Sequence, residues 1–172
     1  MKISILGYSG SGKTTLAKKL GEALNLPIFH LDRIHFRGEW QPKDYQSILE
    51  EIQDILALDH WILEGNYSDY LFTQRLEDSD LILYLRFNRF LCFHRALKRY
   101  LMYRGETRDE LPSGCKEKFD QEFMWWILHK QRSRRKRQAM KKKLEPYQDK
   151  LIYLRNPRQV EHYLKHLRRG KS

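Results

Sequence analysis

Five short apolar segments recur along this chain of 172 residues, and longer segments with apolar residues at helical spacing lie between them. The apolar segments are residues 2–6, 27–32, 61–64, 80–85 and 151–154. Short continuous runs of this kind are typical of strands that are buried on both faces of a parallel sheet. Because these strands alternate with helices, we predict right-handed crossover connections and an α/β fold.

The intervening segments predict helices. The first follows residue 14 and places Leu16, Leu20 and Leu24 on one face. Further helices are expected over residues 44–58, 70–76, 88–103, 119–144 and 160–167. Residues 104–114 contain two Gly and one Pro, which favours a flap, and we place a lid over about 104–118. No internal repeat or low-complexity segment divides the chain, so residues 1–172 are expected to form a single domain.

Between the first strand and the first helix lies a complete phosphate-binding loop, G-x-x-x-x-G-K-[ST], which reads Gly-Tyr-Ser-Gly-Ser-Gly-Lys-Thr over residues 7–14. Its glycines let the backbone bend tightly, and successive N–H groups then point inward at an anion. The Lys13 ammonium can reach the β- and γ-phosphates, and the Thr14 hydroxyl can hold Mg²⁺. The expected nucleotide-binding residues are Gly7, Ser9, Gly10, Ser11, Gly12, Lys13, Thr14 and Thr15.

Two carboxylates and one amide follow other predicted strands. Glu64 ends the third strand, Asp32 ends the second and Asn156 follows the fifth. Ligands of parallel sheets bind beyond the carboxyl ends of the strands, so these side chains should meet the phosphate loop. Glu64 can hold a Mg²⁺-bound water opposite Thr14, or it is a strand-end charge that faces solvent. Asn156, together with Pro157, could pack against an adenine.

Asp32 is the predicted acid-base residue. It could orient or deprotonate an attacking hydroxyl, and the alternative is a helix N-cap or a surface acid. Beside it we expect a polar acceptor pocket, with aromatic residues that either line it or belong to the core: Arg33, Asn66, Tyr67, Phe36 and Trp40.

Arg95 and Arg99 lie four residues apart on one predicted helix and therefore share a face. Phosphoryl transfer spreads negative charge over oxygen atoms, which the planar donors of arginine stabilise. We expect Arg95 and Arg99, with Arg104 from the flap, to close over the phosphates, unless they are solvated helix charges. The predicted catalytic residues are Lys13, Asp32, Arg95 and Arg99.

The charge of the chain is uneven. Residues 1–85 carry 8 basic and 13 acidic side chains, whereas residues 86–172 carry 25 and 9, so the net charges are −5 and +16. The densest basic run covers residues 132–137 and 141–143. It is a solvated helix face, or Arg132 or Arg135 completes the lid while the others contact nucleic acid. A polyphosphate substrate would also explain the excess of positive charge.

The composition of the chain indicates its cellular environment and argues against some classes of protein. Two cysteines, Cys92 and Cys115, form no disulfide framework, which favours a reducing cytoplasm. The chain has no apolar run of 18 residues and enters its first strand directly, so neither a membrane span nor a signal peptide is expected. The histidines show no metal-ligand spacing with cysteine, which argues against a zinc site.

Together these residues resemble the adenylate kinase-like P-loop kinases. The segment Ile62-Leu63-Glu64-Gly65 is similar to that family's hydrophobic-hydrophobic-Asp-Gly, whose acid supports Mg²⁺, which implies this role for Glu64. The family's Pro-Arg after the glycine is absent, and Asn66-Tyr67 stand in its place. In adenylate kinases that arginine helps to hold a nucleoside monophosphate, so the resemblance does not extend to this acceptor.

A second resemblance is to the group of FlaR-like DNA topology modulation proteins. It rests on the phosphate loop, on His30-Leu31-Asp32 with Trp40 downstream, on residues 64–68, on Lys98-Arg99-Tyr100 with Tyr103-Arg104-Gly105, and on residues 125–128 before the basic run. It implies a three-layer α/β/α P-loop fold of the nucleoside and shikimate kinase type. The implied sheet has five parallel strands in the order 2-3-1-4-5, with a helical lid after the fourth.

The leading hypothesis is ATP- and Mg²⁺-dependent phosphoryl transfer to a small-molecule acceptor, which the sequence does not identify. In it, the loop and Lys13 hold ATP, Thr14 and Glu64 hold Mg²⁺, and Asp32 orients the acceptor. One alternative is a nucleic-acid-associated protein whose ATP site affects DNA topology, although no helix-turn-helix or zinc finger is present. The other is an NTPase without an acceptor. The oligomeric state is not fixed by the sequence.

Overall fold

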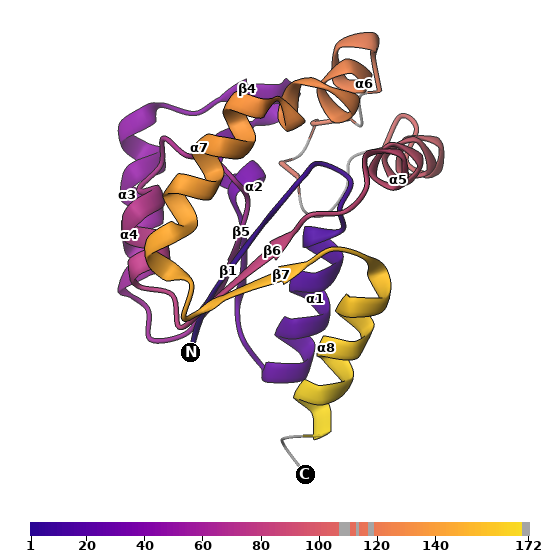
Figure 1. The fold of residues 1–172 in the computed structure, drawn as a ribbon. Helices are drawn as coiled ribbons and strands as arrows, with labels where there is room; N and C mark the ends of the chain where they lie inside the picture. Colours follow the sequence, from indigo (N-terminus) through magenta and orange to yellow (C-terminus); the bar gives the residue numbers. More distant parts are fainter. Residues whose placement is uncertain (107–110, 113, 117–118, 170–172) are drawn as a thin grey trace.

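The computed structural model describes residues 1–106, 111–112, 114–116 and 119–169, and its centre is a parallel sheet (Figure 1). The five strands of this sheet are β1 (Lys2–Gly7), β2 (Ile28–His30), β5 (Trp61–Glu64), β6 (Leu81–Leu85) and β7 (Leu151–Leu154). They pair in the order β2-β5-β1-β6-β7, and every pairing is parallel. Counted along the chain within this sheet, the order is 2-3-1-4-5, so the predicted topology is confirmed.

Helices cover both faces of the sheet, which gives the three-layer α/β/α architecture of P-loop NTPases (Figure 1). On one face lie α1 (Lys13–Leu24) and α8 (Pro157–Arg169), whose apolar residues pack in one core cluster. On the other face lie α3 (Tyr45–Ala57), α4 (Phe72–Glu77) and α7 (Arg134–Leu144), which pack in two further clusters. The predicted fold class is therefore confirmed.

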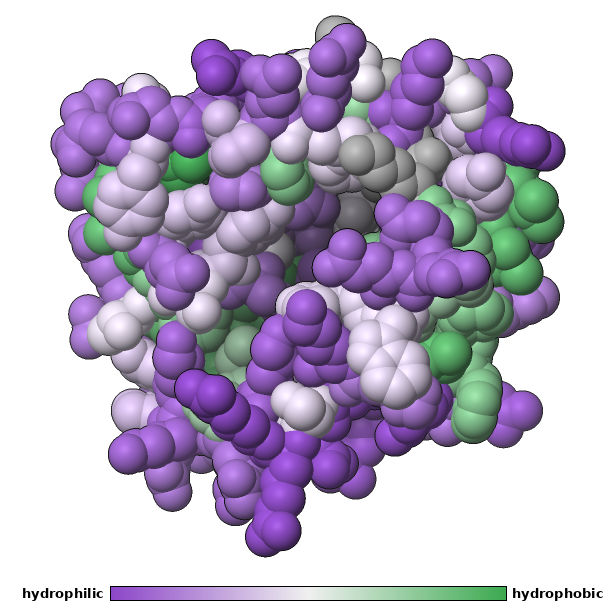
Figure 2. Space-filling view, turned by 90° about the horizontal axis from the view of Figure 1, so that it is seen from above, coloured by the Kyte–Doolittle hydropathy of each residue, from purple (hydrophilic) through white to green (hydrophobic). Residues whose placement is uncertain are grey.

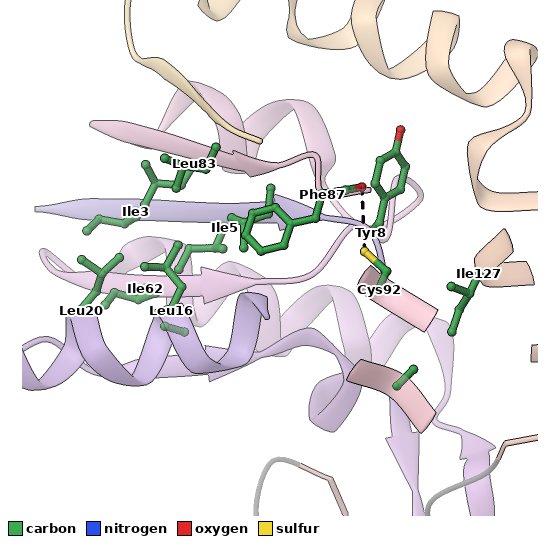
Figure 3. Packing of buried hydrophobic residues seen from close by; sticks show 14 residues of the cluster. Ile3, Ile5, Tyr8, Leu16, Leu20, Ile62, Leu83, Phe87, Cys92 and Ile127 are labelled. Carbon is green, nitrogen blue, oxygen red and sulfur yellow. Dashed lines mark hydrogen bonds between the residues drawn. The ribbon is translucent and has the colours of Figure 1, made fainter. Parts of the chain in front are cut away.

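The core beneath α1 holds the two elements that flank the phosphate loop. Leu16 and Leu20 of α1 pack against Ile3 and Ile5 of β1 and against Ile62 of β5, and all five are almost completely buried (Figure 3). Burying each such side chain stabilises the fold by about 1.5–3 kcal/mol. Because both ends of the loop are anchored in this way, its position relative to the sheet edge is fixed.

Most of the remaining elements surround the loop at the carboxyl edge of the sheet (Figure 1). They are α2 (Leu31–His35), the hairpin of β3 (Phe36–Arg37) and β4 (Gln41–Pro42) with the 3-10 turn η1 (Gly38–Trp40) between them, α5 (Arg89–Met102), α6 (Gln121–Leu128) and the 3-10 turn η2 (Lys130–Arg132). The 3-10 turn η3 (Glu145–Tyr147) instead connects α7 to the start of β7. The sequence predicts an irregular segment over residues 33–42, between the second strand and the helix at 44–58, and this is wrong, because the segment contains the end of α2 and a short hairpin.

The helix predicted over 119–144 is two helices, α6 and α7, separated by η2. The backbone leaves helical geometry at His129 and again at Ser133, whose side chain accepts a hydrogen bond from the Lys136 N–H and caps α7. Serine stabilises such an N-terminus because its hydroxyl binds an N–H that lacks a partner within the helix. The break turns the basic half of the segment back across the sheet, where Leu144 is buried.

The segment predicted as a lid, 104–118, includes residues 107–110, 113 and 117–118, which lie outside the described residues. Its described part contacts the β3–β4 hairpin. The Trp40 N–H donates to Cys115 Sγ at 3.3 Å, the Cys115 thiol donates to the Arg37 carbonyl at 3.4 Å, and Trp40 Nε1 donates to the Lys116 carbonyl at 2.8 Å. Cys115 is fully buried by this contact.

Among the described residues, none of the helices is both long enough and apolar enough to cross a lipid bilayer.

Candidate active site

The phosphate loop packs directly on the backbone of α5. Gly10 has a φ of 76°, and a Cβ atom built on it would lie 2.3 Å from the Cys92 carbonyl oxygen, far inside van der Waals contact. Gly12 has a φ of 91° and precedes the first residue of α1. Both positions therefore require glycine, one for contact with α5 and both for the left-handed backbone. The loop ends at the N-terminus of a long helix, where free N–H groups favour an anion.

The two polar side chains that end the loop lie where the sequence predicts them. The Lys13 ammonium donates a hydrogen bond to the Tyr8 carbonyl at 3.3 Å, back across the loop. The Thr14 hydroxyl donates to Glu64 Oε1 at 3.1 Å, so the loop and the end of β5 are in direct contact.

Glu64 is 4% exposed and also receives a hydrogen bond from His30, with Nδ1 and Oε1 3.0 Å apart. Burial raises the pKa of Glu64, but the hydrogen bond from His30 and the charge of Lys13 outweigh it, so the pKa is lowered and the carboxylate stays ionised. Mg²⁺ prefers oxygen ligands and is usually held by one or two protein side chains together with substrate phosphates. Thr14 and Glu64 supply a hydroxyl and an ionised carboxylate, so the residues present fit this ion.

Asp32 lies one residue into α2 rather than at the end of β2, because the strand stops at His30. Its Oδ1 accepts a hydrogen bond of 2.8 Å from the Tyr67 hydroxyl. Burial and the negative charge of Asp32 raise the pKa of Tyr67, so the phenol stays protonated and continues to donate. Tyr67 therefore fixes the orientation of this otherwise exposed carboxylate.

Asn66 and Gln131 hold the loop through hydrogen bonds that the sequence did not predict. Asn66 Oδ1 accepts from the Gly7 N–H at 3.0 Å, and its Nδ2 donates to the Gly7 carbonyl at 2.8 Å. Gln131 Oε1 accepts from the Ser9 N–H at 2.9 Å, and the Gln131 side chain is nearly buried. Asn66 thus supports the loop, and together with Tyr67 it also lines a cavity beside Asp32.

We expect Asn66→Ala to lower the free energy of unfolding by about 1–3 kcal/mol, since it leaves both polar groups of Gly7 without their partner in a partly buried place. For a chain of this size, that corresponds to a fall in Tm of roughly 2–4 °C per kcal/mol. Thermal unfolding with and without Mg-ATP measures it. The matched control is Ser68→Ala, an exposed side chain two residues away. Equal unfolding temperatures for Asn66→Ala and Ser68→Ala would contradict the assignment.

A cavity of about 700 Å³ extends from the phosphate loop between α1, α5 and α8. Its walls include the loop from Gly10 to Thr15 together with Arg95, Arg99, Tyr103, Pro157 and Val160. Asn156, which the sequence placed at the nucleotide, caps α8 by accepting a hydrogen bond from the Gln159 N–H at 3.0 Å. Of these two neighbours, Pro157 is among the residues that line this cavity.

On the other side of the loop are two cavities that share Ser9, Lys13, Asp32 and Trp126 in their walls. The first, about 480 Å³, adds Thr14, Glu64, Arg99, Trp40 and Phe123, and the second, about 510 Å³, adds residues of α7. In a view onto this end of the molecule, the surface is hollowed near its centre and surrounded by hydrophilic side chains (Figure 2). Trp40 therefore lines a cavity, which is one of the two alternatives that the sequence leaves open for it.

The predicted arginines occupy different places. Arg95 donates to the Ser11 carbonyl at 3.3 Å and lies over the Phe87 ring, so it braces the loop from the side of the large cavity. Arg99 lines both the large cavity and the 480 Å³ cavity, which places it where they meet.

Arg132 is directed into the core instead of the lid. It donates to the Phe87 carbonyl at 2.8 Å and to Cys92 Sγ at 3.2 Å, and its guanidinium stacks 3.8 Å from the centre of the Tyr8 ring. Arg132 therefore ties η2 to the loop and to α5. The predicted role of Arg132 in the lid does not fit these contacts, and Arg135 is exposed.

No protein-family model matches the chain. A segment of 109 residues is 29% identical to proteins described as "Putative adenylate kinase" from Saccharolobus solfataricus (strain P2) and Saccharolobus islandicus (strain M.16.4). The match covers 58% of this chain and 56% of each relative, so the chain spans about half the length of the curated relatives it matches.

Two solved structures share the fold over nearly the whole chain. A shikimate kinase from Bacteroides thetaiotaomicron superposes with a TM-score of 0.52 at 19% identity, over 99% of this chain and 98% of that one. A gluconokinase from Sinorhizobium meliloti 1021 superposes with a TM-score of 0.53 at 16% identity, over 99% and 94%. These likenesses confirm a P-loop kinase fold. Neither the relatives nor the structures named here are described as acting on DNA topology, so that part of the resemblance stays a prediction.

Proposed function

We propose that this protein is an ATP-dependent P-loop kinase that transfers the γ-phosphoryl group of ATP to a hydroxyl group of a small molecule. The observation that carries the proposal is the meeting of two cavities at the phosphate loop. Gly10, Lys13, Thr14 and Arg99 line both the 700 Å³ cavity and the 480 Å³ cavity. A donor and an acceptor bound on either side would approach each other at these residues, as transfer between two substrates requires.

The larger cavity suits ATP, with the phosphates on the loop and the adenine toward Pro157. The acceptor hydroxyl would then lie beside Asp32, which Tyr67 holds in one orientation. The oxygen of the acceptor hydroxyl forms a bond to the γ-phosphorus while the bond from that phosphorus to the β–γ bridging oxygen breaks, which leaves ADP. The hydroxyl proton passes to Asp32 or to water.

Charge stabilisation comes from fixed groups. Lys13 reaches the transferred phosphoryl group, and Arg99, at the junction of the cavities, binds the charge that develops there. Thr14 and Glu64 would hold Mg²⁺, which neutralises phosphate charge when it is bound. The names of the relatives and of the solved structures support the reaction class, since all are kinases.

The test is ADP formation from Mg-ATP against nucleosides, nucleoside monophosphates, sugars and hydroxy acids, with Lys13→Ala as the control. Turnover that an acceptor stimulates and that Lys13→Ala loses would establish the kinase. ATP hydrolysis that no acceptor changes would favour the NTPase without an acceptor.

Arg99→Ala is expected to lower kcat roughly 10²-fold, with a much smaller change in the KM for ATP, because its interaction forms mainly in the transition state. Initial rates over a grid of ATP and acceptor concentrations separate the two constants. The matched control is Arg89→Ala, an exposed arginine on the same helix. A loss confined to ATP affinity, with kcat unchanged, would contradict a role in transfer.

A second candidate function is nucleic-acid binding regulated by ATP. The observation in its favour is a set of exposed cations on α7, namely Arg134, Arg135, Lys141 and Lys142. Binding through such contacts falls steeply with salt, with a logarithmic slope of about −0.9 per phosphate contact on duplex DNA. Titration of labelled duplex and single-stranded DNA over a salt series tests it, and a slope near zero would exclude it.

A further inference from the structure

The charged side chains that line the 510 Å³ cavity are mostly basic. It borders the loop at Ser9 and Lys13, and three further cations from α7 line it: Lys136, Arg137 and Lys143. The carboxylate in its wall is that of Asp32, which already accepts the Tyr67 hydroxyl. The cavity therefore presents more positive charge than its own residues neutralise.

Lys136 and Lys143 share one side of α7 with Met140, because the three are spaced by four and three residues, and Arg137 lines the same cavity from the position next to Lys136. Met140 and Leu144 pack in the core beneath them, which fixes the rotation of the helix. Among the described residues, the ion pairs are formed by other side chains, so none of the three cations is paired with a carboxylate there.

Lys136 packs on Trp126, another residue of this cavity wall. Its ammonium lies 3.8 Å from the centre of the Trp126 ring, and Lys130 approaches the same ring at 5.8 Å. Desolvation by its neighbours and the charge of Lys130 lower the pKa of Lys136, although its side chain is exposed. An anion placed in the cavity would offset the repulsion between the two cations.

We infer that the phosphoryl acceptor is a small molecule with an anionic group, a carboxylate or a phosphate ester, which Lys136, Arg137 and Lys143 bind while its hydroxyl faces Lys13 and Asp32. The inference rests on the proposed function, because it identifies the substrate class of that site. The 480 Å³ and 510 Å³ cavities share Ser9, Lys13, Asp32 and Trp126, so the acceptor hydroxyl would lie where they meet and the anionic group would extend into the 510 Å³ cavity. It also assigns part of the basic run to substrate binding.

The experiment sorts natural acceptors by charge without guessing their identity. A deproteinised bacterial extract is filtered to remove molecules above 3 kDa and separated on an anion-exchange resin into a bound and an unbound fraction. Each fraction is added to the wild-type protein with Mg-ATP, and ADP formation is measured against Lys13→Ala. We expect stimulation by the bound fraction. Treating that fraction with phosphatase, removed before the assay, distinguishes a phosphate ester, which is destroyed, from a carboxylate, which survives.

Variants of α7 test whether this helix binds the anionic group of the acceptor. Lys136→Met and Lys143→Met are each expected to raise the half-saturating amount of the bound fraction roughly tenfold, since a charge-assisted hydrogen bond is lost, and to leave the KM for ATP unchanged. Lys136→Arg should restore most of the binding. The matched control is Lys142→Met, an exposed neighbour on the same helix. A merely structural role would change thermal unfolding and both Michaelis constants together.

Three outcomes would overturn the inference. Lys13-dependent stimulation by the unbound fraction alone would leave a kinase with a neutral or cationic acceptor. Stimulation by the retained material above 3 kDa alone would point to a polyanion such as RNA or DNA. Stimulation by the bound fraction that is equal in Lys136→Met, Lys143→Met and Lys142→Met would place the anion elsewhere. If no fraction stimulates Lys13-dependent turnover, the proposed function fails, and the inference with it.

Discussion

Lys13→Ala is expected to abolish phosphoryl transfer, with a fall in kcat of roughly 10³-fold or more, the size seen when a preorganised charge partner of a transition state is removed. Lys13 lines the 700, 510 and 480 Å³ cavities, so its ammonium can contact both the phosphates and the acceptor side. Arg95, another cation beside the loop, is bound to the Ser11 carbonyl.

The variant should fold normally. Lys13 makes one side-chain hydrogen bond, to the Tyr8 carbonyl, and that carbonyl also accepts from the Ser11 N–H at 3.0 Å. Thermal unfolding within a few degrees of the wild type, measured with the rate, shows that the loss is chemical. Lys165→Ala, the same substitution at an exposed lysine of α8, is the control. Full activity of a folded Lys13→Ala protein would refute the assignment of the site.

Local patterns in the sequence were sufficient for the fold. The loop motif is contiguous, and β5 and β7 have the predicted boundaries because each is a short apolar run that the sheet buries. The meeting of Thr14 with Glu64 also followed, since strand ends in a parallel sheet share an edge.

Contacts that depend on distant partners could not be predicted. Gln131 is bound to Ser9, 122 residues away, and nothing in its own neighbourhood marks it as a loop-binding residue. The position of Arg132 at the start of a basic run favours either a solvated helix face or a place in the lid, whereas its guanidinium stacks on Tyr8. Helical periodicity continues across residues 129–133, and only the Ser133 cap and these contacts to the loop end α6 and begin α7.

The two arginines of α5 show what residue spacing can predict and what it cannot. A separation of four residues correctly places Arg95 and Arg99 on one face, but it does not separate their positions. Arg95 is one turn nearer the loop and reaches the Ser11 carbonyl, whereas Arg99 borders both substrate cavities. Their contributions should therefore differ, with positioning of the loop assigned to Arg95 and charge stabilisation to Arg99.

Glu64→Gln is expected to raise the Mg²⁺ concentration for half-maximal rate by about 10- to 100-fold, which is the usual cost of losing a partner in a metal site. The amide keeps an oxygen that accepts from Thr14 but loses the charge that the lowered pKa maintains at neutral pH. Rates over a Mg²⁺ series at fixed ATP measure the shift. Glu145→Gln, an exposed glutamate in η3, is the matched control.

The Mg²⁺ dependence of the Glu64→Gln rate distinguishes two roles for this buried carboxylate. If Glu64 supports Mg²⁺, excess Mg²⁺ should recover much of the rate of Glu64→Gln, because the remaining oxygen atoms still fit the ion. If Glu64 only joins β5 to the loop and to His30, the variant should lose thermal stability and keep the wild-type Mg²⁺ dependence. An unchanged Mg²⁺ requirement would therefore contradict the metal role. It would leave Glu64 as a structural link that holds the loop against the sheet.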